Sequence, residues 1–175
     1  AWDLHKVDSY EDADLVWLCD PSSPLGQKMD DLGKIISMAK PNQVMVLDCA
    51  YEPLRLEGTL GLQQGDLNKV WQMWSPNKAL GMTGIRGSYV VAPVGFEEVV
   101  QQLKNLASSW VLGAQGVELL SAWADRDIQN WLSSSLIELR QLKNEQIQAC
   151  ESLGWLVLPS VSNFFCVQPS VIDTQ

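Results

Sequence analysis

Two continuous apolar runs constrain the fold of this chain more than any other feature. They are DLVWLC (Asp14–Cys19) and NQVMVLDC (Asn42–Cys49). Runs of this kind are typical of strands buried on both faces, as in a parallel sheet covered by helices. Between them lie a turn with two prolines and a segment, MDDLGKIISMA, whose apolar residues recur at helical spacing. The order strand, helix, strand predicts an α/β fold with a mainly parallel sheet and flanking helices.

The later part of the chain changes character near Pro93–Gly95, which we take as the boundary between two units. Before the boundary, a loop with several glycines separates the second strand from two more predicted strands. After it, apolar residues at helical spacing predict three helices, the last one long, and two short strands close the chain. The predicted elements are strands at Lys69–Trp74 and Ser88–Pro93, helices at Phe96–Leu106, Ala114–Ala124 and Asp125–Leu153, and strands WLVLP and NFFCVQ.

Composition excludes several classes of function. The net charge of −9 and the absence of a basic patch argue against a nucleic-acid partner, and the apolar runs are too short to span a membrane. Four scattered cysteines lack the spacing of a metal site, so we interpret them as reduced core thiols of a cytoplasmic protein. The single histidine, His5, excludes a multi-histidine metal site and argues against a Ser-His-Asp triad, so we expect no metal.

Polar side chains follow the predicted parallel strands at the ends where such sheets bind ligands. The turn DPSSPLG follows the first strand, Asp48 and Tyr51 follow the second, and Ser75 and Lys78 follow the third. Each residue alone has a structural explanation: a capping carboxylate, a core phenol, a solvated ammonium. Together they would bring complementary chemical groups to one end of one sheet, which favours a binding site there.

The segment SPNKALGMTGIRG (Ser75–Gly87) resembles the cofactor-lysine signature of class I/II pyridoxal-phosphate aminotransferases. In that family a serine lies three residues before the lysine and an arginine eight after it, within Gly-x-x-Gly-x-Arg. LDCAYEPL resembles the family's Asp-x-Ala-Tyr strand end, and WLCDPSSPLG resembles its Asn-Pro-x-Asn-Pro-Thr-Gly turn. The resemblance runs from Asp14 to Val167. It is nearest to histidinol-phosphate aminotransferase-like proteins, a subgroup that includes threonine-phosphate decarboxylase.

The resemblance implies a role for each matching residue. Lys78 would be the catalytic residue that forms the internal aldimine with pyridoxal phosphate and then moves the substrate's alpha proton. Asp48 would keep the pyridinium nitrogen protonated, so that the ring acts as an electron sink. Tyr51 would donate a hydrogen bond to the phenolic oxygen of the ring. Ser75 and Arg86 would hold the phosphate, with Arg86 forming a charge-assisted fork.

Two departures from the family pattern bear on these roles. Ser23, a further candidate for cofactor binding, stands where the family has an asparagine, and Leu25 replaces a threonine. Family members are also much longer, so the chain resembles their middle and later part. Residues 1–94 would be part of the large, cofactor-binding domain, with the fourth strand antiparallel at one edge. Residues 95–175 would be a helical connection and part of a small α+β domain.

The resemblance predicts an enzyme that transfers an amino group between an amino acid, or an amino-acid-like phosphate, and a 2-oxo acid. It also implies a homodimer, for which Trp110, Val111 and Leu112 are candidate contacts, and little activity in this chain alone. Three alternatives stay open. They are a non-catalytic binding module of aminotransferase ancestry, a related pyridoxal-phosphate decarboxylase, and a doubly wound domain that binds a phosphorylated ligand. No glycine-rich phosphate loop supports the last of these.

Overall fold

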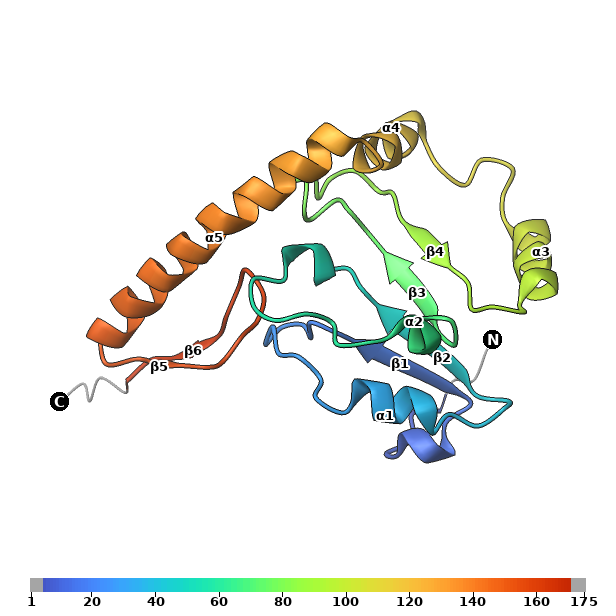
Figure 1. The fold of residues 1–175 in the computed structure, drawn as a ribbon, viewed down its shortest axis with the longest axis horizontal. Helices are drawn as coiled ribbons and strands as arrows, with labels where there is room; N and C mark the ends of the chain where they lie inside the picture. Colours follow the sequence, from blue (N-terminus) through green and yellow to red (C-terminus); the bar gives the residue numbers. More distant parts are fainter. Residues whose placement is uncertain (1–4, 171–175) are drawn as a thin grey trace.

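A four-stranded sheet forms the centre of the structure, a computed structural model that describes residues 5–170 (Figure 1). Strands β1 (Leu15–Cys19), β2 (Val44–Asp48) and β3 (Trp71–Trp74) are parallel neighbours in that order. Strand β4 (Tyr89–Val91) pairs with β3 in the antiparallel direction and forms the far edge. The predicted α/β fold with a mainly parallel sheet is confirmed, as is the antiparallel edge strand.

The helices also fall where the spacing of apolar residues places them, with slightly shorter bounds. One short helix, α2, was missed because the glycines around it indicate a loop. A reciprocal capping box forms it, in which the side chains of Gln63 and Asp66 accept hydrogen bonds from each other's backbone N–H groups. The remaining elements are η1 (Tyr10–Asp12), α1 (Leu32–Ser37), η2 (Glu52–Leu54), α2 (Gln64–Leu67), α3 (Glu97–Leu106), α4 (Ala114–Trp123), α5 (Arg126–Ser152), β5 (Leu156–Val157) and β6 (Val167–Gln168).

The main core lies on one face of the sheet only. Alternate residues of β1 and β2 point to this face, where α1 covers them with Leu32 and Ile36, both almost fully buried. The cluster comprises Val16, Leu18, Leu32, Ile36, Met45, Leu47, Cys49 and Val70. Burying each large aliphatic side chain in such a cluster stabilises the fold by about 1.5–3 kcal/mol.

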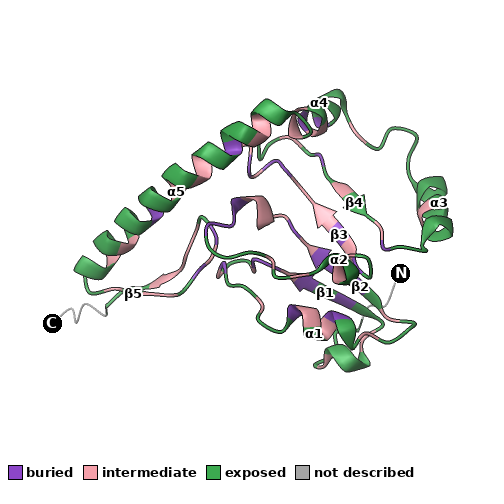
Figure 2. Cartoon of the chain, in the orientation of Figure 1, coloured by how far each residue is buried: buried purple, intermediate pink, exposed green. Residues whose placement is uncertain are grey.

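The opposite face of the sheet is open, so the prediction of strands buried on both faces is wrong for residues 5–170. On this face Leu15 is 47% exposed and Trp17 is 56% exposed, and Figure 2 shows exposed positions alternating with buried ones along β1. Helix α3, none of whose residues is buried, borders an apolar hollow of about 800 Å³ with β2, β3 and β4. A continuous apolar run indicates that both faces of a strand are apolar, but it does not show which element packs on each face.

The long helix α5 connects the sheet to the β5–β6 pair (Figure 1). It begins after Asp125, whose carboxylate accepts a hydrogen bond from the N–H of Asp127 at 2.7 Å. Leu132 of α5 packs in a second cluster with Leu54 and Ala79. Farther along α5, the guanidinium of Arg140 donates from Nε to the Leu56 carbonyl at 2.6 Å. These contacts fix the helix against the loop that follows β2.

The interpretation of all four cysteines as core thiols is wrong for three of them. Cys49 is fully buried, whereas Cys19, Cys150 and Cys166 are partly exposed; all four are unpaired. Sequence shows an apolar neighbourhood along the chain, but Cys19 and Cys166 border loops that leave their sulfur atoms accessible. In the part of the chain from residue 5 to residue 170, no helix is both long and apolar enough to cross a membrane.

Candidate active site

Asp48 lies at the centre of the carboxyl end of the sheet. Its neighbours in register are Cys19 at the end of β1 and Met73 in β3. The carboxylate is partly buried and accepts a hydrogen bond from the N–H of Ala50 at 3.0 Å. This contact fixes one oxygen of the carboxylate at the point where the parallel strands give way to loops.

Tyr51 and Lys78 meet at the same end of the sheet. The ammonium Nζ of Lys78 lies 4.6 Å from the centre of the Tyr51 ring, within the range of a cation–π contact. Tyr51 precedes η2, and its ring also packs edge-on against Phe164 with centroids 4.8 Å apart. Lys78 follows β3 through a short turn and is partly buried. Residues more than 25 positions apart in sequence are therefore brought into contact by the parallel register of β2 and β3.

Cys19 belongs to this cluster as well, although sequence reasoning gave it no role. Burial and the nearby Asp48 carboxylate raise the pKa of the Cys19 thiol, while a hydrogen bond with the backbone of Ser23 and the Lys78 charge oppose the rise. The thiol donates a hydrogen bond to the Pro21 carbonyl at 3.3 Å, and the strand register places Cys19 beside Asp48. Cys19 could have been predicted from its position alone, because it is the last residue of a strand that neighbours the strand ending at Asp48.

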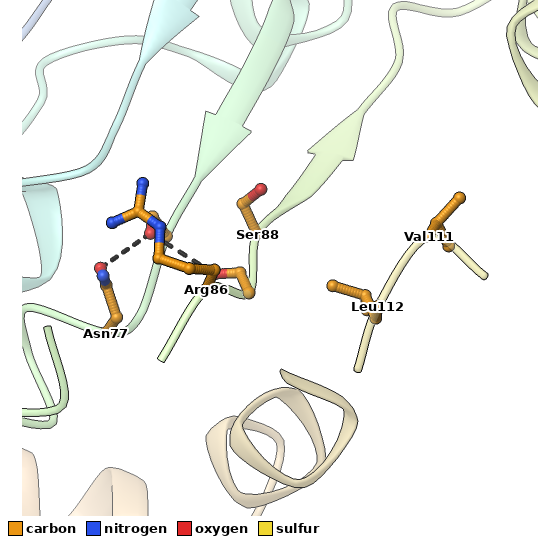
Figure 3. Close-up of a pocket in the computed structure, with 7 residues that line it drawn as sticks. Asn77, Arg86, Ser88, Val111 and Leu112 are labelled. Carbon is orange, nitrogen blue, oxygen red and sulfur yellow. Dashed lines mark hydrogen bonds between the residues drawn. The ribbon is translucent and has the colours of Figure 1, made fainter. Parts of the chain in front are cut away.

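Ser75 and Arg86 line a separate cleft of about 260 Å³ next to the Lys78 loop (Figure 3). The Ser75 hydroxyl donates a hydrogen bond to Oδ1 of Asn77 at 2.8 Å, and Arg86 is exposed to solvent. In Figure 3, Val111 and Leu112 form the wall opposite Arg86. Asn77 and Ser88 also line the cleft, and neither was recognised from the sequence. Each is adjacent to a motif residue, which is the only signal that sequence offers for them.

A third feature is a pocket of about 490 Å³ that Lys78 shares with α5. Most of its lining is apolar and comes from the Lys78 loop and from α5, including Trp131 and Leu139, with Leu54 of η2. Glu138 and Asn163 add polar groups. The pocket lies between the lysine loop and the long helix, so both elements determine what can approach Lys78 from this side.

The structure therefore groups the predicted residues in two places. Asp48, Tyr51 and Lys78 gather at the carboxyl end of the sheet, and Ser75 and Arg86 line the adjacent cleft. Ser23 lies exposed in the turn after β1, two residues beyond Pro21, whose carbonyl accepts a hydrogen bond from the Cys19 thiol at 3.3 Å. Within residues 5–170, no group of three or more histidine, cysteine, aspartate or glutamate side chains could hold a metal ion.

Comparison with known proteins decides the family. The family model for aminotransferase class I and II matches residues 3–170. The chain belongs to the class I and II aminotransferase family. A histidinol-phosphate aminotransferase of Pectobacterium carotovorum is 22% identical over 98% of this chain and 50% of its own length. One from Staphylococcus aureus is 35% identical over 47% of this chain and 25% of its own length.

Solved structures agree with this aminotransferase assignment at the level of the fold. A decarboxylase from Sulfurospirillum multivorans is 20% identical, with a TM-score of 0.75 over 93% of this chain and 43% of its own. L-threonine-O-3-phosphate decarboxylase from Porphyromonas gingivalis is also 20% identical, with a TM-score of 0.68 over 91% and 51%. This aminotransferase chain spans about half the length of the curated relatives that it matches over nearly its whole sequence.

Proposed function

We propose that this chain holds pyridoxal phosphate and forms the cofactor-binding part of an enzyme that transfers amino groups. The residues fit the chemistry of that cofactor. An amine, a carboxylate and a phenol, from Lys78, Asp48 and Tyr51, gather at one end of the sheet. The neighbouring cleft offers the hydroxyl of Ser75 and the guanidinium of Arg86 to an anionic group. The membership of the chain in the aminotransferase family supports the same cofactor.

The contact between Lys78 and Tyr51 carries this proposal. A lysine reacts with an aldehyde through its amine, so the amine has to lie at the end of the site where the cofactor aldehyde would be held. Lys78 is partly buried over an aromatic ring, next to an aspartate at the strand end. The amine of Lys78 and the carboxylate of Asp48 therefore come from neighbouring strand ends, and a pyridine aldehyde offers a partner to each.

Each residue would have one task in the reaction. The cofactor, when bound, would supply an electron sink for the substrate's alpha carbon. Lys78 would hold the cofactor aldehyde and then carry the proton removed from that carbon. Asp48 would stabilise the protonated pyridine nitrogen, and Tyr51 would donate to the ring's phenolic oxygen. Ser23 would add a hydroxyl to that oxygen, although its exposed position makes Tyr51 the principal donor.

The substrates and the assembly are part of the same proposal. The donor would be an amino acid or an amino-acid-like phosphate, and the acceptor a 2-oxo acid. The chain would act as a homodimer, with residues 1–94 and 95–175 as portions of a large and a small domain. Trp110, which is 90% exposed, and Val111, which is 66% exposed, remain candidates for the dimer contact. A decarboxylase of similar fold is the alternative that the structural neighbours leave open.

Cofactor capture by the purified chain tests the proposal directly. On addition of pyridoxal phosphate, we expect a visible absorbance band, and borohydride followed by peptide mapping should place the label on Lys78. Lys78→Arg should abolish both signals, whereas the matched variant Lys104→Arg should leave them unchanged. Label distributed equally over several lysines, or a band that survives in Lys78→Arg, would reject the proposed role. A non-catalytic binding module would give no label on any lysine.

A further inference from the structure

A buried ion network lies beside the proposed site but takes no part in the chemistry described above. Asp20 is 1% exposed and Arg55 is 7% exposed. The guanidinium of Arg55 donates from Nη2 to Asp20 Oδ1 at 2.6 Å and from Nε to Glu52 Oε2 at 2.7 Å. Charged side chains are rarely buried to this extent without a structural or functional reason.

The network joins three segments that are distant in sequence. Asp20 begins the turn after β1, and Arg55 follows η2, the segment that starts next to Tyr51. The backbone of Arg55 forms an isolated antiparallel bridge with Ser162, two residues before Phe164. Val161 in turn donates its N–H to the Gly26 carbonyl at 2.7 Å, which closes the connection back to the turn. Tyr51 therefore belongs to both parts of this connection, because it directly precedes η2 and its ring packs against Phe164.

The charges in the network depend on each other. Burial lowers the pKa of Arg55, but the hydrogen bonds to Asp20 and Glu52 outweigh it and raise the pKa overall. Burial raises the pKa of Glu52, and Arg55 opposes that rise. Removing one member of such a buried pair leaves an uncompensated charge, so the surrounding backbone has to move or take in water. Nη1 of Arg55 has no hydrogen-bond partner among residues 5–170, so the network is already one bond short.

We propose that the Asp20–Arg55 ion pair is a positioning pair for Tyr51, and through Tyr51 for the amine of Lys78. Arg55 holds η2 through Glu52 and the Phe164 segment through the backbone bridge to Ser162, and these two constraints set the ring of Tyr51. The Tyr51 ring in turn contacts the Lys78 ammonium. This inference rests on the proposed function only for its catalytic consequence, because the contact between Tyr51 and Lys78 exists without a cofactor.

The first experiment measures that contact in the cofactor-free chain. In protein labelled with carbon-13 lysine, the ring of Tyr51 should shift the Lys78 ε-methylene signal. Lys78→Arg assigns that signal, and Tyr51→Leu, which removes the ring, measures the shift. We expect Arg55→Met to abolish most of this shift. The double variant Asp20→Asn with Arg55→Gln, which replaces the ion pair by a neutral hydrogen-bonded pair, should recover it. Leu32→Ala is the control for lost stability, because Leu32 belongs to a different core cluster from Tyr51, so this variant should retain the shift.

The second experiment adds pyridoxal phosphate to the same variants. Misplacement of a reacting group by a fraction of an ångström slows reactions severalfold or more, so Arg55→Met should slow growth of the visible band by about tenfold. In a Tyr51→Leu background, which lacks the ring, the rate should change less, because Arg55 acts through the ring of Tyr51.

The outcomes separate the two proposals. An unchanged Lys78 signal in folded Arg55→Met overturns the positioning role. If Arg55→Met does not fold, loss of the signal in the folded double variant overturns it, because the neutral pair should hold Tyr51 in place. A signal lost equally in Leu32→Ala does the same. If the native chain forms no visible band while the signal still depends on Arg55, the proposed function fails and the positioning role stands. If the band forms normally but its rate is independent of Arg55, the positioning role fails alone.

Discussion

At the scale of single residues, Cys49 shows how the position of a side chain fixes its chemistry. It is fully buried under the carboxyl end of β2, and burial raises the pKa of its thiol to about 12 from an ordinary value of 9.0. The native chain therefore keeps this proton above pH 9, while the unfolded chain releases it. Because the native state binds more protons, the free energy of unfolding falls as the pH rises from 9 towards 12.

We predict that this loss has a slope approaching about 1.4 kcal/mol per pH unit between those values. Urea unfolding of the native chain and of Cys49→Ala at pH 8, 9.5 and 10.5 measures it. The difference in stability between the two proteins should shrink as the pH rises. A difference that stays constant over this range would show that Cys49 ionises in the folded chain as readily as in the unfolded one.

Sequence could identify the residues of the site that belong to a motif, and it missed those that depend on register. Lys78, Asp48 and Tyr51 were singled out because they match a family motif, and the structure brings them to one end of the sheet. Cys19 enters the cluster only because β1 pairs with β2 so that Cys19 lies opposite Asp48. The Asp20–Arg55 pair joins residues 35 positions apart, and neither residue type by itself indicates burial.

At the scale of elements, the packing of α4 sets the wall of the Arg86 cleft. An added Cβ at Gly116 of α4 would lie 2.8 Å from the backbone carbonyl oxygen of Arg86. An added Cβ at Gly87 would in turn lie 3.2 Å from the Gly116 carbonyl. The two backbones are therefore in direct contact, and α4 holds Arg86 through this contact without a side chain between them.

We predict that Gly116→Ala destabilises the chain by about 1–3 kcal/mol, because backbone atoms cannot retreat as a flexible side chain can. The matched control is Gly65→Ala in α2, where no atom lies within 4 Å of the added Cβ. Gly65→Ala should be neutral or stabilising by about 0.5–1 kcal/mol, since alanine restricts the unfolded helix segment. Chemical unfolding of both variants measures the contrast, and equal stability of the two would contradict the close approach of α4.

Helices and strands could be predicted where the spacing of apolar residues or the family resemblance indicated them. The long helix α5, the parallel strands and the antiparallel edge all follow from apolar spacing or from the resemblance. Helix α2 did not, because its four residues include Gly65 and its stability comes from the reciprocal bonds of Gln63 and Asp66. Capping by polar side chains does not depend on the spacing of apolar residues, so the hydrophobic pattern indicates such a helix only weakly.

At the scale of the whole molecule, the chain has one well-covered and one open face of its sheet (Figure 2). The open face carries Leu15, Trp17 and Val90, and α3 presents Leu103 at 52% exposure near the same hollow. Apolar surface of this extent is unusual for an isolated domain. It accords with the finding that the chain spans about half the length of its curated relatives.

Catalytic turnover would need a group that holds the substrate carboxylate, and among residues 5–170 the pocket beside Lys78 has no second lysine or arginine in its lining. Of the arginines, Arg55 is buried between two carboxylates, and Arg86 lines the cleft proposed for the phosphate. Arg140 donates to the Leu56 carbonyl, and Arg126 does not line the pocket beside Lys78. Lys143 is held by Glu57 and the Ser160 carbonyl. Besides Lys78, the charged residue that lines this pocket is Glu138, whose carboxylate would repel a substrate carboxylate.

We therefore predict that the 175-residue chain captures pyridoxal phosphate on Lys78 but has transaminase activity near background. Covalent capture requires an accessible neutral amine, whereas turnover also requires the substrate to be held in a reactive orientation, which contributes about 7–11 kcal/mol in well-oriented reactions. A coupled assay with amino acid and 2-oxo acid pairs, run beside borohydride labelling of the same sample, measures both properties. Glu138→Arg supplies a cation at the pocket and should raise the residual rate for carboxylate substrates, with Glu145→Arg on the same helix as the control. Robust turnover by the unmodified chain would show that one of the cations described above is free to bind substrate.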